Sequence, residues 1–207
     1  MLTILGKSPS INVRKVLWTC AEIGLPFQQE QYGAGTQPVN TPDFVRLNPN
    51  AMVPVIVDED FVLWESNVIC RYLAGKHGRG DLLSTDPCAR AQVEQWMDWQ
   101  ATELNNAWRY AFMALVRNSP AHTDQQAIAA SIDHWNQHMM IFEAQLQKTG
   151  AYAAGADFTL ADIVLGLSTH RWFSMPMDRT VLPAVNAYYE RLSLRTGFMQ
   201  YGRNGLP

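Results

Sequence analysis

The sequence has few charged residues and no dense cluster of either sign. Charged side chains make up 17% of the 207 residues, and the formal net charge is −3. Because nucleic-acid binding depends on clustered Lys and Arg, we expect no nucleic-acid partner. No apolar run approaches the roughly 20 residues that a membrane-spanning helix needs, and the N-terminus lacks a signal-peptide pattern. The composition, with 47% hydrophobic residues, is that of a globular protein with no membrane partner.

Cysteine is also scarce, and its placement argues against several kinds of site. Cys20, Cys70 and Cys88 are an odd, widely spaced set that fits neither a disulfide scaffold nor a zinc site, and no C-x-x-C pair occurs. The His residues lack metal-ligand spacing, and no nucleophile-elbow pattern is present. We therefore expect no metal, no Ser-His-Asp hydrolysis and no thioredoxin-type disulfide exchange. The free cysteines favour a reducing compartment, the cytoplasm.

The first 77 residues alternate short apolar runs with helical patterns. Gly24 and Pro26 end the first helical pattern, and Pro54 stands at the start of a later apolar run. These patterns predict strands over 2–5, 27–32, 53–57 and 61–64, and helices over about 13–23, 42–47 and 65–74. The resulting β-α-β-α-β-β-α order is typical of a small α/β domain with a mixed sheet.

The second half of the chain is predicted to be helical throughout. Gly78-Arg79-Gly80 marks a change of composition, and we place a linker at about 78–86. Asp86 and Pro87 then match an N-cap followed by Pro at the first helical position. Apolar residues at helical spacing predict helices over about 87–117, 124–148 and 182–194, and a further helix that begins at Thr159.

The start of that further helix has the clearest local motif of the second half. Thr159 matches an N-cap whose partner is Asp162, the Asp form of a capping box. Phe158 and Ile163 occupy the two positions of a hydrophobic staple. We interpret this motif as a folding signal without chemistry.

The stretch 48–74 carries a pattern that indicates ligand binding. A proline at a strand's first residue is often cis, which would turn the N–H and C=O of Val53 outward. Ser66 opens the next helix, whose unpaired N–H groups favour a carboxylate. Glu65 adds an acceptor for an ammonium group. Each feature alone has a plain structural explanation, a turn or a helix cap, but together they would hold a γ-glutamyl peptide.

The segment VPVIVDEDFVLWESNVICRYLA resembles the glutathione-binding stretch of the glutathione S-transferases, where Val-Pro precedes a hairpin and Glu-Ser opens the next helix. The resemblance covers the whole chain. It implies a thioredoxin-like α/β domain over 1–77 and an all-α helical domain over 87–207 that contributes the acceptor-substrate pocket. It also implies glutathione as co-substrate, lying on Val53 and Pro54 with its γ-glutamyl end on Glu65 and Ser66.

The resemblance places the thiolate-stabilising residues in the loop 8–12, at the start of the first helix. The segment SINVRKV, residues 10–16, matches without a gap the bacterial relatives that carry a Ser-x-Asn loop, which assigns Ser10 and Asn12. Counting back from the helix residues RKV instead assigns Ser8, as in serine-type transferases. The third interpretation is that this loop only caps its helix. No cysteine occurs in the loop, which argues against mixed-disulfide chemistry.

The acceptor substrate is expected against the helical domain. Candidate pocket residues near the ends of two helices are Trp108, Arg109, Phe112, His170, Arg171 and Trp172, of which Trp108, Arg109, Phe112 and Trp172 are our choice. Because buried aromatic side chains are usually packing, most of these residues are expected in the core. Met52 departs from the family, since many relatives have Lys or Arg there to pair with a carboxylate of the tripeptide.

The expected function is transfer of glutathione to small electrophilic molecules, a detoxification reaction of a cytoplasmic homodimer. Two alternatives stay open: a glutathione-dependent peroxidase or disulfide reductase, and a non-catalytic binding or regulatory protein of the same fold. The Val-Pro and Glu-Ser pairs favour catalysis, whereas Met52 favours the non-catalytic alternative. The sequence does not identify the physiological acceptor.

Overall fold

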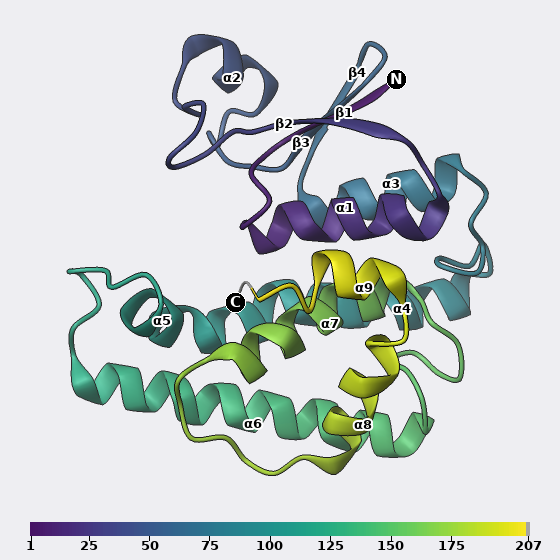
Figure 1. Ribbon diagram of the computed structural model, residues 1–207. Coiled ribbons are helices and arrows are strands. Elements are labelled where there is room, and N and C mark those ends of the chain that lie inside the picture. Colours follow the sequence, from purple (N-terminus) through teal and green to yellow (C-terminus); the bar gives the residue numbers. More distant parts are fainter. Residues whose placement is uncertain (206–207) are drawn as a thin grey trace.

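Four short strands pair into one mixed sheet in the computed structural model, which describes residues 1–205 (Figure 1). The strands are β1 (Leu2–Leu5), β2 (Phe27–Glu30), β3 (Val55–Asp58) and β4 (Phe61–Trp64), in the order β2-β1-β3-β4. β2 is parallel to β1, whereas the β1–β3 and β3–β4 pairs are antiparallel. β3 begins two residues later than predicted, after the Val53–Pro54 bond, because proline cannot donate to the ladder.

Helices cover both faces of this sheet. Ile4 and Ile56 are buried in one core with α1 (Ile11–Ile23) and α3 (Ser66–Lys76). On the opposite face Leu5 and Val55 form a smaller cluster with Phe44 of α2 (Pro42–Leu47). Side chains alternate between the faces of a strand, so β1, β3 and β4 supply both cores. This arrangement confirms the predicted thioredoxin-like α/β fold of the N-terminal half.

The C-terminal half is helical, as predicted, and packs against the α1 and α3 side of the sheet domain (Figure 1). Its elements are α4 (Pro87–Trp99), η1 (Gln100–Leu104), α5 (Asn105–Leu115), α6 (Gln125–Thr149), α7 (Leu160–Ser174), α8 (Pro183–Leu192) and α9 (Thr196–Tyr201). η1 is a π-helical segment within what the sequence predicted as one continuous helix over 87–117. No helix within residues 1–205 combines the length and apolarity that crossing a membrane requires.

α9 was missed by the sequence analysis. It has only six residues and contains Gly197, which lowers helix propensity. Tertiary packing requires that glycine, because an added Cβ would lie 2.5 Å from the Trp18 ring. Trp18 is fully buried and also packs on Phe158 and Phe198, with ring centroids 5.8 and 5.1 Å away. One hydrophobic core therefore continues from α1 into the helical half.

The capping box at the start of α7 is confirmed. The Asp162 carboxylate accepts the backbone N–H of Thr159 at 2.8 Å and, in addition, the N–H of Ala153 at 2.9 Å and the Tyr188 hydroxyl at 3.2 Å. Phe158 is buried at the same helix start. Burial raises the pKa of Asp162 to about 6. The motif thus connects α7, α8 and the loop before α7.

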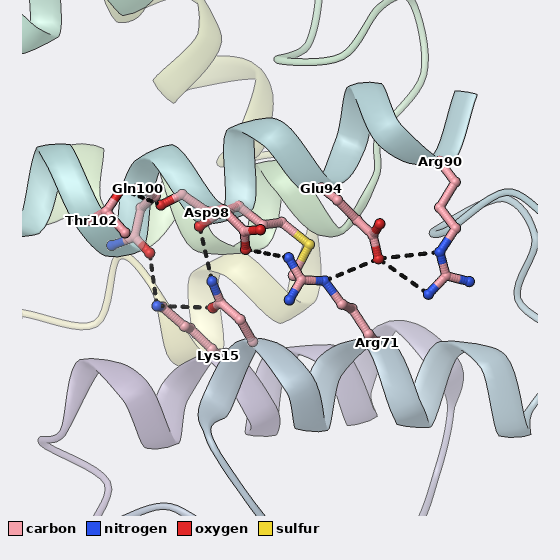
Figure 2. Close-up of polar contacts among 9 residues, drawn as sticks. Lys15, Arg71, Arg90, Glu94, Asp98, Gln100 and Thr102 are labelled. Carbon is pink, nitrogen blue, oxygen red and sulfur yellow. Dashed lines mark hydrogen bonds and ion pairs between the residues drawn. The ribbon is translucent and has the colours of Figure 1, made fainter. Parts of the chain in front are cut away.

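Polar contacts join the two halves beside the shared core. Figure 2 shows Lys15 and Arg71 pointing towards the helix that carries Glu94 and Gln100. The buried Lys15 amine donates to Asn67 Oδ1 at 3.1 Å and to Gln100 Oε1 at 2.8 Å. Burial lowers the pKa of this amine to about 8. Arg71 forms an ion pair with Glu94 at 3.3 Å. Lys15 therefore fixes the start of α3, through Asn67, to the π-helical segment.

Candidate active site

A cavity of about 150 Å³ lies where β3 and α3 begin, next to the first turn of α1. It is lined by Asn12, Asn48, Asn50, Met52, Val53, Pro54, Glu65 and Ser66. The structure thus brings together five residues that the sequence indicated: Asn12, Val53, Pro54, Glu65 and Ser66.

A larger cavity, about 480 Å³, lies between the linker and the loop before α7. Two of its charged residues, Asp81 and Arg195, are already paired, with Arg79 at 2.6 Å and Glu22 at 2.5 Å, and the third, Asp157, is exposed. Because the two paired charges are neutralised by protein groups and Asp157 is open to solvent, the smaller cavity is the better candidate for ligand binding.

Val53 presents free backbone groups to the smaller cavity. The Val53–Pro54 peptide bond is cis, as the position of the proline suggested. Within residues 1–205, neither the N–H nor the C=O of Val53 makes a hydrogen bond. Backbone groups that lack a protein partner are normally satisfied by water or by a ligand. An extended peptide can therefore pair with Val53 as an added strand would.

The N-terminus of α3 forms the opposite wall. Ser66 is its first residue and is buried, whereas the preceding Glu65 is exposed and makes no capping hydrogen bond. The simple cap interpretation of Glu65 is therefore wrong. Glu65 has φ +72°, a conformation that is uncommon outside glycine and is concentrated at functional sites. Its carboxylate is available for a cation, and the uncapped N–H groups of α3 are available for an anion.

The loop before α1 positions the three candidate thiol-binding residues differently. Asn12, in the first turn of α1, lines the cavity, whereas Ser8 and Ser10 are not among the described lining residues. Ser10 is the N-cap residue, but its hydroxyl makes no capping hydrogen bond. The Ser8 hydroxyl accepts a hydrogen bond from Gln29 Nε2 at 3.2 Å. Of the three, Asn12 has the clearest access to a ligand.

Sequence reasoning missed three residues at this site. Gly6 has φ +156°, and an added Cβ would lie 2.5 Å from a methyl group of Val13 and 3.2 Å from Val53. Only glycine therefore lets the loop pass this close to the cavity wall. Asn48 and Asn50 were assigned no role at the site. No sequence pattern indicated one, because a loop folds them back onto the cavity.

The four residues proposed for the acceptor pocket do not line the cavity. Trp108, Phe112 and Trp172 are buried in the helical half, and Arg109 is exposed. The Arg171 guanidinium lies over the Trp108 and Phe112 rings, 4.5 and 4.1 Å from their centroids. Burial lowers the pKa of Arg171 to about 9.

Comparisons with known families agree with the two halves of the fold. The family model for the glutathione S-transferase N-terminal domain matches residues 1–75, and that for the glutathione S-transferase C-terminal domain matches residues 125–191. The chain is 36% identical over 197 residues to glutathione S-transferase GstB of Escherichia coli K12, with 94% of each chain covered. It is 30% identical to glutathione S-transferase 3 of Zea mays, covering 96% of this chain and 92% of that one.

Solved structures give the same result. The theta class glutathione S-transferase of Xanthomonas axonopodis pv. citri, with glutathione bound, matches with a TM-score of 0.92 at 35% identity. That match covers 100% of this chain and 99% of the other. Glutathione transferase F7 of Populus trichocarpa matches with a TM-score of 0.87 at 26% identity, covering 99% of both chains. The chain therefore belongs to the glutathione S-transferase family.

Proposed function

We propose that this protein is a glutathione transferase that binds glutathione in the cavity beside Val53 and stabilises its thiolate for attack on a small electrophile. One observation carries the proposal: a single cavity combines the free backbone of Val53, the carboxylate of Glu65 and the uncapped start of α3. These groups complement the peptide bond, the ammonium and the carboxylate of a γ-glutamyl peptide.

The reaction requires the protein to favour the thiolate. A free thiol has a pKa of about 8.5, so only a few per cent is ionised at pH 7. Lowering that pKa by about two units requires about 2.7 kcal/mol of selective stabilisation. Hydrogen bonds to charged groups contribute about 1.5–3 kcal/mol each, so one or two donors suffice. We assign this role to Asn12 and Ser10, with glutathione attacking and neither residue forming a covalent bond.

In this proposal residues 1–77 hold glutathione, residues 78–86 link the halves, and residues 87–207 supply the acceptor pocket. Trp108, Phe112 and Trp172 are buried, so they would shape the pocket by supporting its wall, and the exposed Arg109 would contact solvent or acceptor. Detoxification in the cytoplasm is the biological role that fits this chemistry.

An activity screen separates this function from its alternatives. Glutathione is combined in turn with chlorodinitrobenzene, an organic hydroperoxide and hydroxyethyl disulfide. Conjugation of the first supports the transferase. Turnover of only the second or third would instead indicate a peroxidase or a disulfide reductase. Glutathione binding without turnover of any of them would indicate a non-catalytic binding protein.

Glu65→Gln should weaken glutathione binding by about 2 kcal/mol, roughly thirtyfold, because the bound ammonium loses its charged partner. Calorimetric titration with glutathione measures the change. Glu59→Gln is the matched control, since Glu59 also has positive φ but lies outside the cavity. Equal affinities of the two variants for glutathione would show that its γ-glutamyl end does not bind at Glu65.

We also propose a homodimer in which the sheet domain of one subunit packs on the helical domain of the other. The exposed apolar residues of the sheet domain include Met52, Phe61 and Val68. The helical half offers a shallow pocket of about 240 Å³ lined by Gln95, Trp96, Trp99 and Ile141. Burial of such surfaces is the usual driving force for association.

Light scattering at micromolar concentration should therefore report twice the chain mass of 23.4 kDa. Ile141→Glu should shift the protein towards monomer, because it places a charge in the apolar pocket. Val181→Glu, at an exposed position outside that pocket, is the control and should leave the mass unchanged. A monomeric wild-type protein would contradict the dimer.

A further inference from the structure

The candidate glutathione cavity contains no positively charged side chain among the residues that the structure describes. Glu65 carries its one charge, and the remaining polar side chains, Asn12, Asn48, Asn50 and Ser66, are neutral. Glutathione has two carboxylates, of which the start of α3 can bind the one in the γ-glutamyl group. The glycine carboxylate must then lie near the neutral end of the cavity, formed by Asn48, Asn50 and Met52.

Every basic side chain of the sheet domain is engaged elsewhere. Six Lys and Arg residues occur in residues 1–76. Lys7 donates to the Ala34 carbonyl, Arg14 to Asn204, Lys15 to Asn67 and Gln100, Arg46 to Asp43, Arg71 to Asp98 and Lys76 to Asp58. Within residues 1–76, each side-chain guanidinium or ammonium group thus already has a protein acceptor, and none of them lines the cavity.

The neutral end is also largely saturated by its own hydrogen bonds. The Asn48 amide donates to the Met52 carbonyl at 2.8 Å, and its oxygen accepts both the backbone N–H and the side-chain amide of Asn50, each at 3.0 Å. The Met52 side chain is 66% exposed and has no donor. This end can accommodate the glycine residue of glutathione, but it offers little that distinguishes a carboxylate from an amide.

The charge of Glu65 does not change this, because in the proposed complex it pairs with the γ-glutamyl ammonium. Once that pair has formed, the cavity has no unpaired charged side chain that would favour a glycine carboxylate over a neutral amide. From this charge distribution, we propose that the transferase accepts γ-glutamylcysteinyl thiols whose glycine carboxylate is amidated, including amides that carry an amine, as well as it accepts glutathione. The inference rests on the proposed function, since it names the thiol class for the same cavity.

The test compares three thiols with chlorodinitrobenzene: glutathione, its glycine amide and its aminopropyl amide. Each rate is divided by the rate of the same thiol without protein, which removes differences in intrinsic reactivity. We expect kcat/KM for each of the two amides within about threefold of that for glutathione. A loss greater than about tenfold with both amides would overturn the inference, because it would show that a cation binds the carboxylate.

Met52→Lys tests whether the glycine residue of bound glutathione lies beside residue 52. An ammonium group at this position should raise the preference for glutathione over its glycine amide by about tenfold. Val181→Lys adds the same charge at an exposed position outside the cavity and should leave the preference unchanged. An unchanged preference in Met52→Lys would contradict the placement of the glycine residue beside Met52.

Lys7→Ala tests whether the Lys7 ammonium leaves the Ala34 carbonyl and binds the glycine carboxylate when the thiol binds. If wild-type protein rejects the amides and Lys7→Ala accepts them, Lys7 leaves Ala34 to bind the carboxylate, and the inference is wrong. If the protein conjugates none of the three thiols, the proposed function itself fails. Conjugation of glutathione with rejection of both amides overturns only the inference about the thiol class.

Discussion

Asn12→Ala should raise the pKa of the glutathione thiol in the complex by about one to two units and slow conjugation at pH 7 roughly ten- to hundredfold. Asn12 lines the cavity from the first turn of α1, and its carboxamide can donate two N–H bonds to a thiolate. Ser10 contributes a hydroxyl that its helix does not use as a cap. Glutathione affinity should change less than the rate, because these donors act mainly on the charged sulfur.

The measurement is thiolate absorbance near the ultraviolet edge against pH, with glutathione bound to Ser8→Ala, Ser10→Ala and Asn12→Ala. Ser8→Ala is the matched control for Ser10→Ala, since its hydroxyl is bonded to Gln29. We expect shifts in Asn12→Ala and Ser10→Ala. A shift confined to Ser8→Ala would mean that the serine-type alignment is right, and no shift in any variant would leave the loop a purely structural role.

Asp162→Ala should destabilise the fold by about 3 to 5 kcal/mol. The residue is fully buried, and its loss leaves the N–H groups of Ala153 and Thr159 and the Tyr188 hydroxyl without their acceptor. Each unsatisfied buried donor costs about 1–3 kcal/mol. Urea denaturation followed by fluorescence gives the free energy of unfolding.

Asp124→Ala is the control for this variant. Asp124 caps α6 by accepting the N–H groups of Gln126 and Ala127, but it is exposed, so water can replace it. We expect a loss of about 1 kcal/mol there. If the two variants were equally stable, the Asp162 motif would be an ordinary helix cap with no additional role in the core.

The pH dependence of stability provides a test that does not require Asp162→Ala to fold. Burial raises the pKa of Asp162 to about 6 from 3.8. The folded state therefore binds this proton more tightly than the unfolded chain, and the stability contribution of Asp162 falls as pH rises from about 4 to about 6. Relative to Asp162→Asn, which does not titrate, the wild-type protein should lose about 3 kcal/mol over this interval.

The sequence predicted those features that depend on neighbouring residues. The hairpin, the helix start at Ser66 and the capping box at Thr159 are local patterns, and the structure places each where it was expected. α9 and η1 depend instead on distant partners. Gly197 is required by Trp18, and Gln100 in the π-helical segment receives the Lys15 amine, so neither leaves a periodic signal.

The residues of the candidate site also divide into those set by neighbouring residues and those set by distant partners. Val53 and Glu65 could be found because their properties arise from the next residue in the chain, a proline or a helix start. Asn48 became part of the site only through a loop that folds back, and its hydrogen bond to Met52 is visible only in three dimensions. Trp108 could not be assigned from sequence, because its contact with Arg171 joins two helices that lie far apart in the chain.

The contact between Trp18 and the helical half limits how this chain can recombine with its relatives. An added Cβ at Gly166 would lie 3.1 Å from the Trp18 ring, and one at Gly197 would lie 2.5 Å from it. A chimera that joins this N-terminal half to a foreign C-terminal half must therefore carry glycine at both positions, or a smaller side chain in place of Trp18. Lys15 adds a second requirement, since a graft lacking the Gln100 amide would enclose its amine with one acceptor fewer. The two halves are thus matched to each other in shape and polarity, and we expect an exchange at the linker to succeed only when the incoming half supplies both the glycines and the amide.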